Sequence, residues 1–339
     1  MKKNKLFVIL PLLSLVLASC GVKTKNTSVF YYDENDTFIK ELRNYIQHGL
    51  DNSGFTYNFY YANKSQAAQN TQLTKEIENK SDNVLIVNTV DRLADATIIE
   101  KAKSYNLPII FFNREPLDSD LSNETSFYYV GSNPETEGLL QAEMAANLFG
   151  NPNSLNPLYD KNGDNKIQLI LLKGEQGHQD MENRSKYCIE GLRNKGYTLD
   201  ILTTEYCNWN RVTAYDAMSS IYPTYGDSME LLFSNNDDMA LGAIDYFLVK
   251  DIFKNGVKDV SEQPFPVIGV DGTGVAISAI KNHLLYGTVR NDSFQQASAI
   301  VSLANYIVDG EKIDSSFPFK FSSNNKIYIE GKSIIYSDI

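Results

Sequence analysis

The strongest constraint on the fold is an alternation of short, continuous apolar runs with longer segments of helical periodicity. The apolar runs are Ser28–Tyr32, Thr56–Tyr61, Asn83–Val87, Pro108–Phe112, Ile167–Leu172, Met229–Phe233 and Pro266–Val270. The helical segments are Thr37–Leu50, Gln66–Glu78, Ala94–Tyr105, Thr136–Phe149, Met181–Lys195, Arg211–Ile221, Met239–Phe247, Val275–His283 and Phe294–Val308. Continuous apolar runs are typical of strands covered on both faces. The alternation therefore predicts an α/β fold of parallel sheets with right-handed crossovers.

The series of strands and helices runs twice along the chain, with a break near residues 113–133. About 320 residues remain after the first twenty, which exceeds the size at which a single hydrophobic core usually keeps growing. We therefore expect two lobes.

Residues 1–20 have the pattern of an export signal. Lys2, Lys3 and Lys5 give a positive start, and residues 6–17 are almost wholly apolar. This run of roughly a dozen residues suits a signal-peptide core, whereas a membrane-spanning helix needs about 20. The small residues before Cys20 have the form of a bacterial lipoprotein processing site, so we expect a diacylglycerol group on Cys20 and a polar tether over residues 21–28. The alternative is an ordinary secretory signal with a chance cysteine.

Charge, cysteines and histidines argue against several kinds of site. A net charge of −11 argues against nucleic-acid binding, which requires a basic face. Cys188 and Cys207 remain after processing, and their pairing stays open because two cysteines do not make a disulfide framework. His48, His178 and His283 are scattered and lack zinc-ligand spacing.

Polar side chains gather at the carboxyl ends of the predicted strands, where ligands bind in folds of this kind. They are Asp36, Asn88, residues 113–115, residues 175–180, residues 235–237, Asp271 and residues 291–292. Carboxylates and amides can each hold two neighbouring hydroxyl groups, and the set contains no Ser-His-Asp triad or phosphate loop. It predicts a neutral, polyhydroxylated ligand, although any one of these residues taken singly is more often a helix cap.

The segment Asp160–Gln168 offers oxygen ligands with the spacing of a calcium-binding loop. Side-chain oxygens stand at loop positions 1, 3, 5 and 9, and the carbonyl of Lys166 stands at position 7. Asn165 occupies the position usually given to glycine, and asparagine tolerates a left-handed backbone. Position 12 is apolar, so the bidentate carboxylate has to come from elsewhere, and Glu230 is the candidate. A polar turn without metal is the alternative.

Several short runs, spread along the chain in a consistent order, carry a family resemblance. They are Asp36–Phe38, Val87–Asp91, Phe111–Pro116, Tyr129–Gly131, Leu171–Asp180, Asn235–Asp237, Gly269–Asp271 and Gly287–Asp292. In these runs the sequence resembles the D-galactose/D-glucose-binding proteins of the periplasmic binding protein class, over residues 29–329. The resemblance implies a protein that delivers a monosaccharide, D-glucose or D-galactose, to the membrane subunits of an ABC transporter.

The resemblance also assigns the sugar-binding residues. They are Asp36, Phe38, Asn88, His178, Asp180, Arg184, Trp209, Asn236, Asp271 and Asn291. Phe38 and Trp209 match the two rings that sandwich the sugar, whose C–H faces are apolar. Asp36 matches the acceptor for the 4-hydroxyl of either epimer. The histidine and arginine should donate hydrogen bonds, the other carboxylates accept them, and the asparagines do both.

The family also has a calcium site in the place of the predicted loop. The implied ligands of a structural Ca²⁺ are Asp160, Asn162, Asp164, Lys166 through its carbonyl, Gln168 and Glu230. A few positions depart from the family pattern without removing a sugar ligand. Arg114 stands where a lysine is common, and Gln176 and Gln179 stand where prolines are common.

The implied fold is the type I periplasmic binding protein fold, in which two Rossmann-like lobes are joined by a three-segment hinge. We place the three chain crossings near Asn113, Asn291 and Tyr328. The N-terminal lobe is then residues 29–113 plus 292–327, and the C-terminal lobe is residues 114–291 plus 328–339. We expect a monomer without enzyme activity, held by its lipid anchor on the extracytoplasmic face of the cell membrane.

Other interpretations differ in ligand or class. A protein of the same fold could bind a pentose or autoinducer-2, and a pentose would leave space at the 5-substituent. A DNA-binding regulator with related lobes would need a helix-turn-helix where the export signal stands. A glycosidase would need two carboxylates flanking the bond. Asp36, Asp180 and Asp271 could imitate such a pair, but their neighbours suit the holding of hydroxyl groups.

Overall fold

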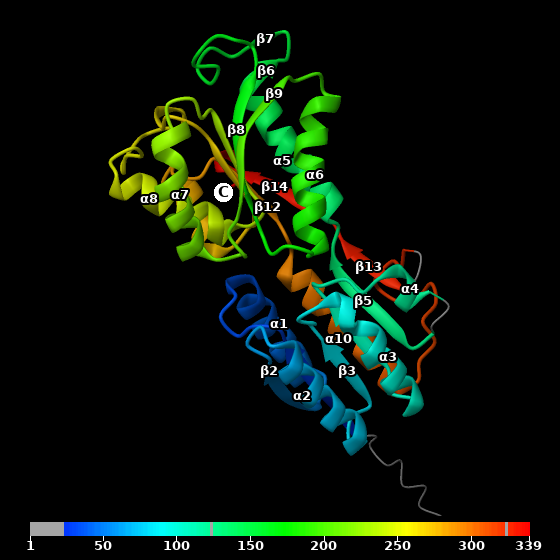
Figure 1. Cartoon of the computed structure of the whole chain (residues 1–339). Coiled ribbons are helices and arrows are strands. Elements are labelled where there is room, and N and C mark those ends of the chain that lie inside the picture. The colour runs from blue at the N-terminus through cyan, green and yellow to red at the C-terminus, as the bar shows by residue number, and fades with distance from the viewer. Residues whose placement is uncertain (1–23, 123–124, 323–324) are drawn as a thin grey trace, which may run out of the picture.

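The computed structural model describes residues 24–122, 125–322 and 325–339, so the predicted export signal and the lipidation site at Cys20 lie outside the described residues. The described chain forms two lobes, each a six-stranded sheet flanked by helices, as Figure 1 shows. This is the α/β architecture expected from the sequence. No helix in the described part of the chain combines the length and apolar character needed to cross a membrane.

The N-terminal lobe is built on a parallel sheet with the strand order β13-β5-β4-β3-β1-β2. Its strands are β1 (Lys25–Tyr31), β2 (Phe55–Tyr61), β3 (Val84–Val87), β4 (Ile109–Phe112), β5 (Phe127–Ser132) and β13 (Lys326–Ile329). Its helices are α1 (Thr37–Asn52), α2 (Gln66–Asn79), α3 (Asp95–Ser104), α4 (Asp118–Leu121) and α10 (Ser293–Asp309). Ile86 belongs to the core under α1 and α10, and its neighbour Leu85 to the core under α2 and α3. Burial on both faces explains the continuous apolar runs.

The C-terminal lobe repeats this plan with the strand order β14-β12-β11-β10-β8-β9. Its strands are β8 (Ile167–Lys173), β9 (Leu199–Tyr206), β10 (Leu231–Ser234), β11 (Val267–Asp271), β12 (Gly287–Arg290) and β14 (Lys332–Ile335), which runs antiparallel to β12. Its helices are α5 (Pro134–Phe149), α6 (Gln179–Asn194), α7 (Arg211–Tyr225), α8 (Asp237–Val249) and α9 (Gly274–Lys281). A small hairpin of β6 (Gly150–Asn151) and β7 (Ser154–Leu155) lies at the end of this lobe far from the other (Figure 1).

The structure corrects two of the three predicted chain crossings. The strand β5 pairs with β4 and β13, so the chain first leaves the N-terminal lobe at Asn133 and not near Asn113. The strand β13 continues to Ile329, and the last crossing lies at residues 330–331 rather than at Tyr328. The middle crossing, between β12 and α10, lies at residues 291–292. Sequence reasoning missed β5 and β13, whose sheet is decided by long-range hydrogen bonds to β4 and to each other.

The first strand also begins earlier than expected. Residues 25–28, assigned to the tether, belong to β1 and pair with β2. The residues before Ser28 are polar and gave no sign of a strand, but Thr27 is buried, and its hydroxyl donates to the carbonyl of Val84 at 2.8 Å. Cys188 and Cys207 are buried free thiols and do not form a disulfide.

Candidate functional site

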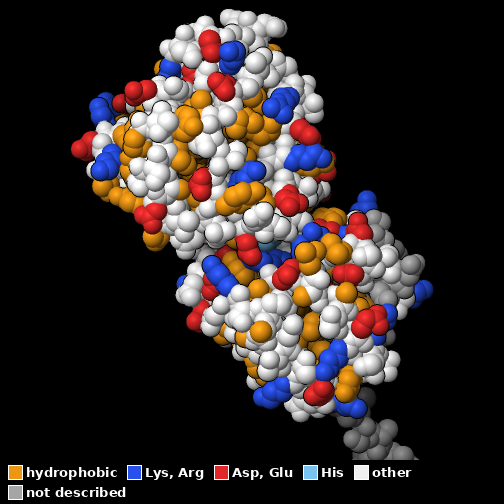
Figure 2. Space-filling model, in the orientation of Figure 1, with side chains coloured by type: hydrophobic (Ala, Val, Ile, Leu, Met, Phe, Trp, Pro, Cys, Tyr) orange, Lys and Arg blue, Asp and Glu red, His pale blue; other side chains and the backbone are white. Residues whose placement is uncertain are grey.

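A cavity lies between the lobes, beyond the carboxyl ends of strands from both sheets. It is lined by Tyr32, Asp36, Phe38, Ile39, Asn113, Arg114, His178, Asp180, Arg184, Trp209, Asn236, Asp271 and Asn291. Nine of the ten residues that the resemblance assigned to sugar binding are in this lining, and Asn88 is the exception. Figure 2 shows the lobes meeting at a narrow waist, where acidic and basic side chains gather. The cavity occupies the position at which α/β folds of this kind bind ligands.

Several lining residues are helix N-caps. Asp36 caps α1, and its Oδ1 accepts a hydrogen bond from the backbone N–H of Ile39 at 2.9 Å. Asn236 caps α8 in the same way, through the N–H of Met239 at 3.0 Å. The second oxygen of Asp36 accepts from the hydroxyl of Tyr32 at 2.6 Å. Because each helix begins directly after a strand, the cap positions of both lobes come together at the cleft.

His178 caps α6 with its ring. Its Nδ1 accepts from the backbone N–H of Asp180 at 3.2 Å, which leaves the ring proton on Nε2. Burial, followed by the charges of Arg114 and Arg184, holds the pKa of His178 well below its ordinary value. The ring is therefore neutral at pH 7 and carries one N–H donor, as the resemblance implied.

Phe38 and Trp209 supply one aromatic ring from each lobe. The indole of Trp209 meets the His178 ring edge to face, with 5.1 Å between centroids, and the Arg184 guanidinium lies 5.9 Å from the indole centroid. Trp209 has a φ of 61°, which is rare for a bulky residue. A Cβ at Gly174 would lie 2.2 Å from the indole, so only glycine fits beneath it. Strained backbone of this kind is typical of functional positions.

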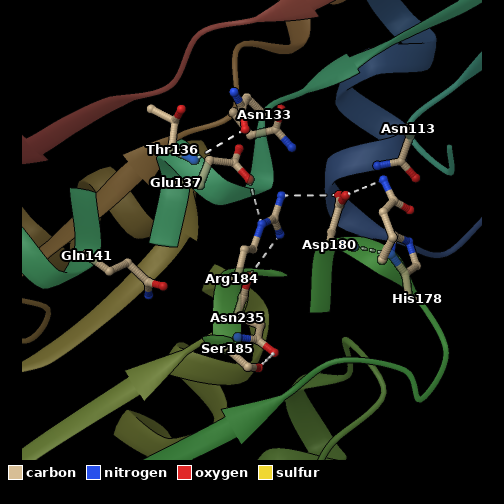
Figure 3. A network of polar contacts seen from close by, with 12 residues as sticks. Asn113, Asn133, Thr136, Glu137, Gln141, His178, Asp180, Arg184, Ser185 and Asn235 are labelled. Carbon is tan, nitrogen blue, oxygen red and sulfur yellow. Dashed lines mark hydrogen bonds and ion pairs between the residues drawn. The ribbon is translucent and has the colours of Figure 1, made fainter. Parts of the chain in front are cut away.

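Arg184 is the centre of a buried charge network, shown in Figure 3. Its Nε donates to Glu137 Oε2 at 2.6 Å, its Nη1 donates to the carbonyl of Asn235 at 2.9 Å, and its Nη2 lies 3.5 Å from Asp180 Oδ2. Glu137, on α5, is fully buried. Sequence reasoning missed it, because a glutamate inside a helical segment carries no local sign that it faces inward.

Burial shapes the charge state of the cavity carboxylates. It raises the pKa of Asp180 to about 7, although Arg184 acts to lower it. Burial also raises the pKa of Asp271 well above its ordinary value. A carboxylate taken out of water is stabilised by hydrogen-bond donors. The cavity therefore favours a ligand that donates several hydrogen bonds, as a sugar does.

The structure places Asn88 behind the residues that line the cavity, so its assignment as a sugar ligand stays a prediction. Its side chain is fully buried and donates to the carbonyl of Phe112 at 3.2 Å and to Asn113 Oδ1 at 3.1 Å. Its own Oδ1 accepts from the backbone N–H of Tyr32 at 3.3 Å. Asn88 thus braces two residues that do line the cavity. Of the lining residues outside the assigned set, Asn113 and Arg114 were visible in the sequence as polar residues at a strand end.

Polar contacts join the lobes around the cavity. The Thr37 hydroxyl of the N-terminal lobe donates to Asp238 Oδ2 of α8 at 2.6 Å. Arg114 Nη2 donates to Glu175 Oε2 at 2.6 Å, and its guanidinium carbon lies 4.1 Å from the ring centroid of Tyr32. The lobes are therefore closed upon each other.

The predicted calcium loop lies between the β6–β7 hairpin and β8. Asn165 has the expected left-handed conformation, with a φ of 60°, and its side chain accepts from the N–H of Leu155 at 3.0 Å. Glu230 lies against the loop, since its two oxygens accept from the backbone N–H groups of Lys161 at 2.6 Å and Gln168 at 3.2 Å. The fold thus brings the distant carboxylate to the loop.

Two oxygens of this loop are left without a partner. Asp160 Oδ1 and Gln168 Oε1 are buried and make no hydrogen bond. Buried polar atoms are rarely unsatisfied, and oxygen atoms of this kind suit a hard cation. Within the described residues no group of three or more His, Cys, Asp or Glu side chains could hold a metal ion. The implied ligands Asp160, Asp164 and Glu230 belong to that residue set and do not form such a group, so the calcium site stays a prediction that rests on the two unpaired oxygens.

Comparison with known proteins gives one family. Residues 28–312 match the model of the periplasmic binding protein domain family. The chain is 34% identical over 286 residues to the D-galactose/methyl-galactoside binding periplasmic protein MglB of Haemophilus influenzae, covering 84% of this chain and 81% of that protein. It is 21% identical over 318 residues to the ribose import binding protein RbsB of Escherichia coli, covering 94% and 96%.

Solved structures agree on the fold. An ABC transporter solute binding protein from Bacillus halodurans with bound myo-inositol has a TM-score of 0.76 at 22% identity, covering 94% of this chain and 97% of that one. At this identity the likeness shows the fold alone.

Proposed function

The chain belongs to the periplasmic binding protein family, and we propose that it is the substrate-binding lipoprotein of an ABC sugar transporter and binds D-glucose or D-galactose. The observation that carries this proposal is the interlobe cavity, where two aromatic rings and hydrogen-bonding side chains from both lobes converge. The galactose-binding relative from Haemophilus influenzae supports a hexose. The matched family and relatives are solute-binding proteins and not enzymes, which sets the glycosidase interpretation aside.

The proposed binding mode divides the sugar into faces and edge. Phe38 and Trp209 pack on the two apolar faces of the pyranose ring. The hydroxyl groups on its edge meet carboxylates that accept, such as Asp36 and Asp271, and the Arg184 guanidinium, which donates. A sugar that lacks one hydroxyl leaves a buried protein group unpaired, at a cost of about 1–3 kcal/mol.

Closure links binding to transport. The sugar touches residues of both lobes and therefore favours the closed form over an open one. In the closed form, surfaces of the two lobes lie side by side. The membrane subunits of the transporter would bind this combined surface. The predicted lipid on Cys20 would keep the protein on the extracytoplasmic face of the membrane, near those subunits.

A structural Ca²⁺ belongs to the same proposal. The unpaired oxygens of Asp160 and Gln168 would hold it together with Asn162, Asp164 and the carbonyl of Lys166. Glu230 would complete the set from the start of β10. Such an ion supplies a positive charge that ties the loop to the sheet.

The decisive experiment is calorimetric titration of the exported protein with D-glucose, D-galactose, D-ribose, D-xylose and myo-inositol. We expect one of the two hexoses to bind most tightly. Trp209→Ala should weaken hexose binding by about 100-fold, because the partly buried indole loses its proposed contact with the sugar face, worth roughly 3 kcal/mol.

The matched control is Tyr206→Ala, which removes an exposed ring from the end of β9 and should leave the affinity unchanged. Tighter binding of a pentose would reject the hexose assignment in favour of the alternative ligand. Unchanged hexose affinity in Trp209→Ala would reject the role of the indole.

A further inference from the structure

Gln179 makes side-chain contacts with a cavity carboxylate and with the opposite lobe. It is the first residue of α6 and is 7% exposed. Its Nε2 donates to Asp180 Oδ1 at 2.7 Å. Its Oε1 accepts from the backbone N–H of Glu115 at 3.3 Å, and its Nε2 also lies 3.4 Å from Glu115 Oε2. A single amide thus joins a residue of the N-terminal lobe to a carboxylate of the C-terminal lobe that lines the interlobe cavity.

Glu115 is held firmly within the N-terminal lobe. Its Oε1 accepts from Lys326 Nζ at 2.5 Å and from the hydroxyl of Tyr328 at 2.9 Å, both on β13. The Arg92 guanidinium donates to the backbone carbonyl of Glu115 at 2.6 Å. Because β13 leads directly into the last chain crossing, Glu115 moves with the N-terminal lobe and the hinge strand. When the lobes separate, Gln179 loses this partner.

We propose that Gln179 is a positioning residue, which fixes the Asp180 carboxylate for the sugar only when the lobes are closed. The proposal rests on the hexose-binding function proposed above. In the closed form Glu115 orients the amide of Gln179, and the amide N–H then holds Asp180 Oδ1. In the open form the amide is free to turn, and the carboxylate loses a donor that keeps it in place.

This coupling depends on an amide at residue 179, one of the two positions at which the family resemblance implies proline. Proline has no side-chain donor or acceptor, so it could not join Glu115 to Asp180. Gln176 stands at a second such position in the same loop and is exposed. The two glutamines therefore form a matched pair, in which only Gln179 bridges the lobes.

The test compares the isosteric variants Gln179→Leu and Gln179→Met with wild type by calorimetric titration of the preferred hexose. We expect both variants to bind about 10-fold more weakly at pH 8.5, where the Asp180 carboxylate is charged, because a hydrogen bond to a charged group is lost. Gln176→Leu should bind as wild type does. Circular dichroism and thermal unfolding establish that each variant is folded, and the second variant covers failure of the first to fold.

The pH profile separates positioning from simple packing. Burial raises the pKa of Asp180 to about 7. The groups that face it are Arg184 on its own helix, Glu137 on α5, Arg114 and Glu115 after β4, Tyr129 on β5 and Tyr328 on β13. Hexose affinity in wild type should fall as the pH drops through this value. The Gln179 amide favours the charged carboxylate, so its removal raises the pKa and moves the loss of affinity to higher pH.

The outcomes distinguish the two levels of the proposal. If the folded Gln179 variants have the same hexose affinity and the same pH profile as wild type, Gln179 has no positioning role. A weaker affinity with an unshifted pH profile also overturns it, because packing alone would then explain the loss. Absence of hexose binding by the wild-type protein refutes the proposed function instead.

Discussion

At the scale of single residues, the same side chains serve the fold and the cavity. The sequence left open whether the polar residues at strand ends were helix caps or ligands. Asp36, His178 and Asn236 are caps, and all three also line the cavity. A capping side chain uses one oxygen or nitrogen atom to accept a hydrogen bond from the backbone. Its other polar atoms stay available to bind a ligand. The two interpretations are therefore compatible.

Glu137 offers the clearest residue-scale prediction. Glu137→Gln should destabilise the protein by about 3 kcal/mol, because the buried Arg184 guanidinium loses its nearest charged partner. Hexose affinity should fall as well, since Arg184 lines the cavity. Urea unfolding measures the first effect and calorimetry the second.

Glu135→Gln is the control for this substitution. Glu135 stands in the first turn of the same helix and is exposed, so its change should alter the free energy of unfolding by less than about 0.5 kcal/mol. Equal stability of the two variants would contradict a structural role for the Glu137–Arg184 pair.

At the scale of elements, the loop before β8 depends on tertiary contacts for its shape. Asn165 holds the β6–β7 hairpin by donating to the carbonyl of Pro152 at 2.9 Å. Glu230 reaches the loop from beside β10, which is paired with β8 in the sheet. The loop is thus closed on one side by a hairpin and on the other by a strand. The two buried oxygens without partners remain inside this enclosure.

Chelation tests the proposed calcium at this scale. Removal of Ca²⁺ should lower the melting temperature by about 5 °C, and added Ca²⁺ should restore it, because an ion that binds only the folded state stabilises it. Differential scanning calorimetry measures the shift.

Glu230→Gln should abolish the response to calcium, whereas Glu143→Gln, an exposed change on α5, should preserve it. If neither the chelator nor added Ca²⁺ changes the melting temperature of the wild-type protein, the loop is a polar turn that binds no metal.

At the scale of the whole molecule, three chain crossings and a few polar contacts govern how the lobes meet. The crossings lie at Asn133, residues 291–292 and residues 330–331. Thr37 with Asp238, and Arg114 with Glu175, bridge the cleft directly. Interlobe contacts of this kind stabilise the closed form with or without a ligand. They therefore change the affinity for the ligand although they make no contact with it.

Thr37→Val tests this adjustment. The variant loses the hydroxyl that donates to Asp238 but keeps the side-chain shape, so hexose affinity should fall about 5-fold. The change in radius of gyration on sugar addition, measured by small-angle scattering, should be larger than in wild type, because the sugar-free protein is more open.

Thr71→Val is the matched control, because the Thr71 hydroxyl donates only to the carbonyl of Ala67 on an exposed helix face. Wild-type affinity in Thr37→Val would mean that the contact with Asp238 contributes nothing to closure.

Much of this protein can be read from local sequence. Seven strands and nine helices were predicted close to their observed positions, because burial on both faces of a parallel sheet leaves an apolar run that needs no partner to be recognised. Among the strands that were missed, β9, β13 and β14 lie at sheet edges and β12 is short, whereas β5 lies inside its sheet. Six of the nine assigned cavity residues stand at strand ends, which are local features, whereas Phe38, Arg184 and Trp209 were assigned by the family resemblance alone.

Long-range pairing determined what the sequence alone could not. The membership of β5 in the first sheet depends on hydrogen bonds with β4 and β13, and the pairing with β13 spans most of the chain. The inward orientation of Glu137 depends on where α5 packs against α6, and the contact of Gln179 with Glu115 depends on how the two lobes meet. Local propensity and periodicity therefore determined the elements and the kind of side chains at their ends. Tertiary packing decided which of these side chains meet, because burial and electrostatic pairing are properties of the assembled lobes.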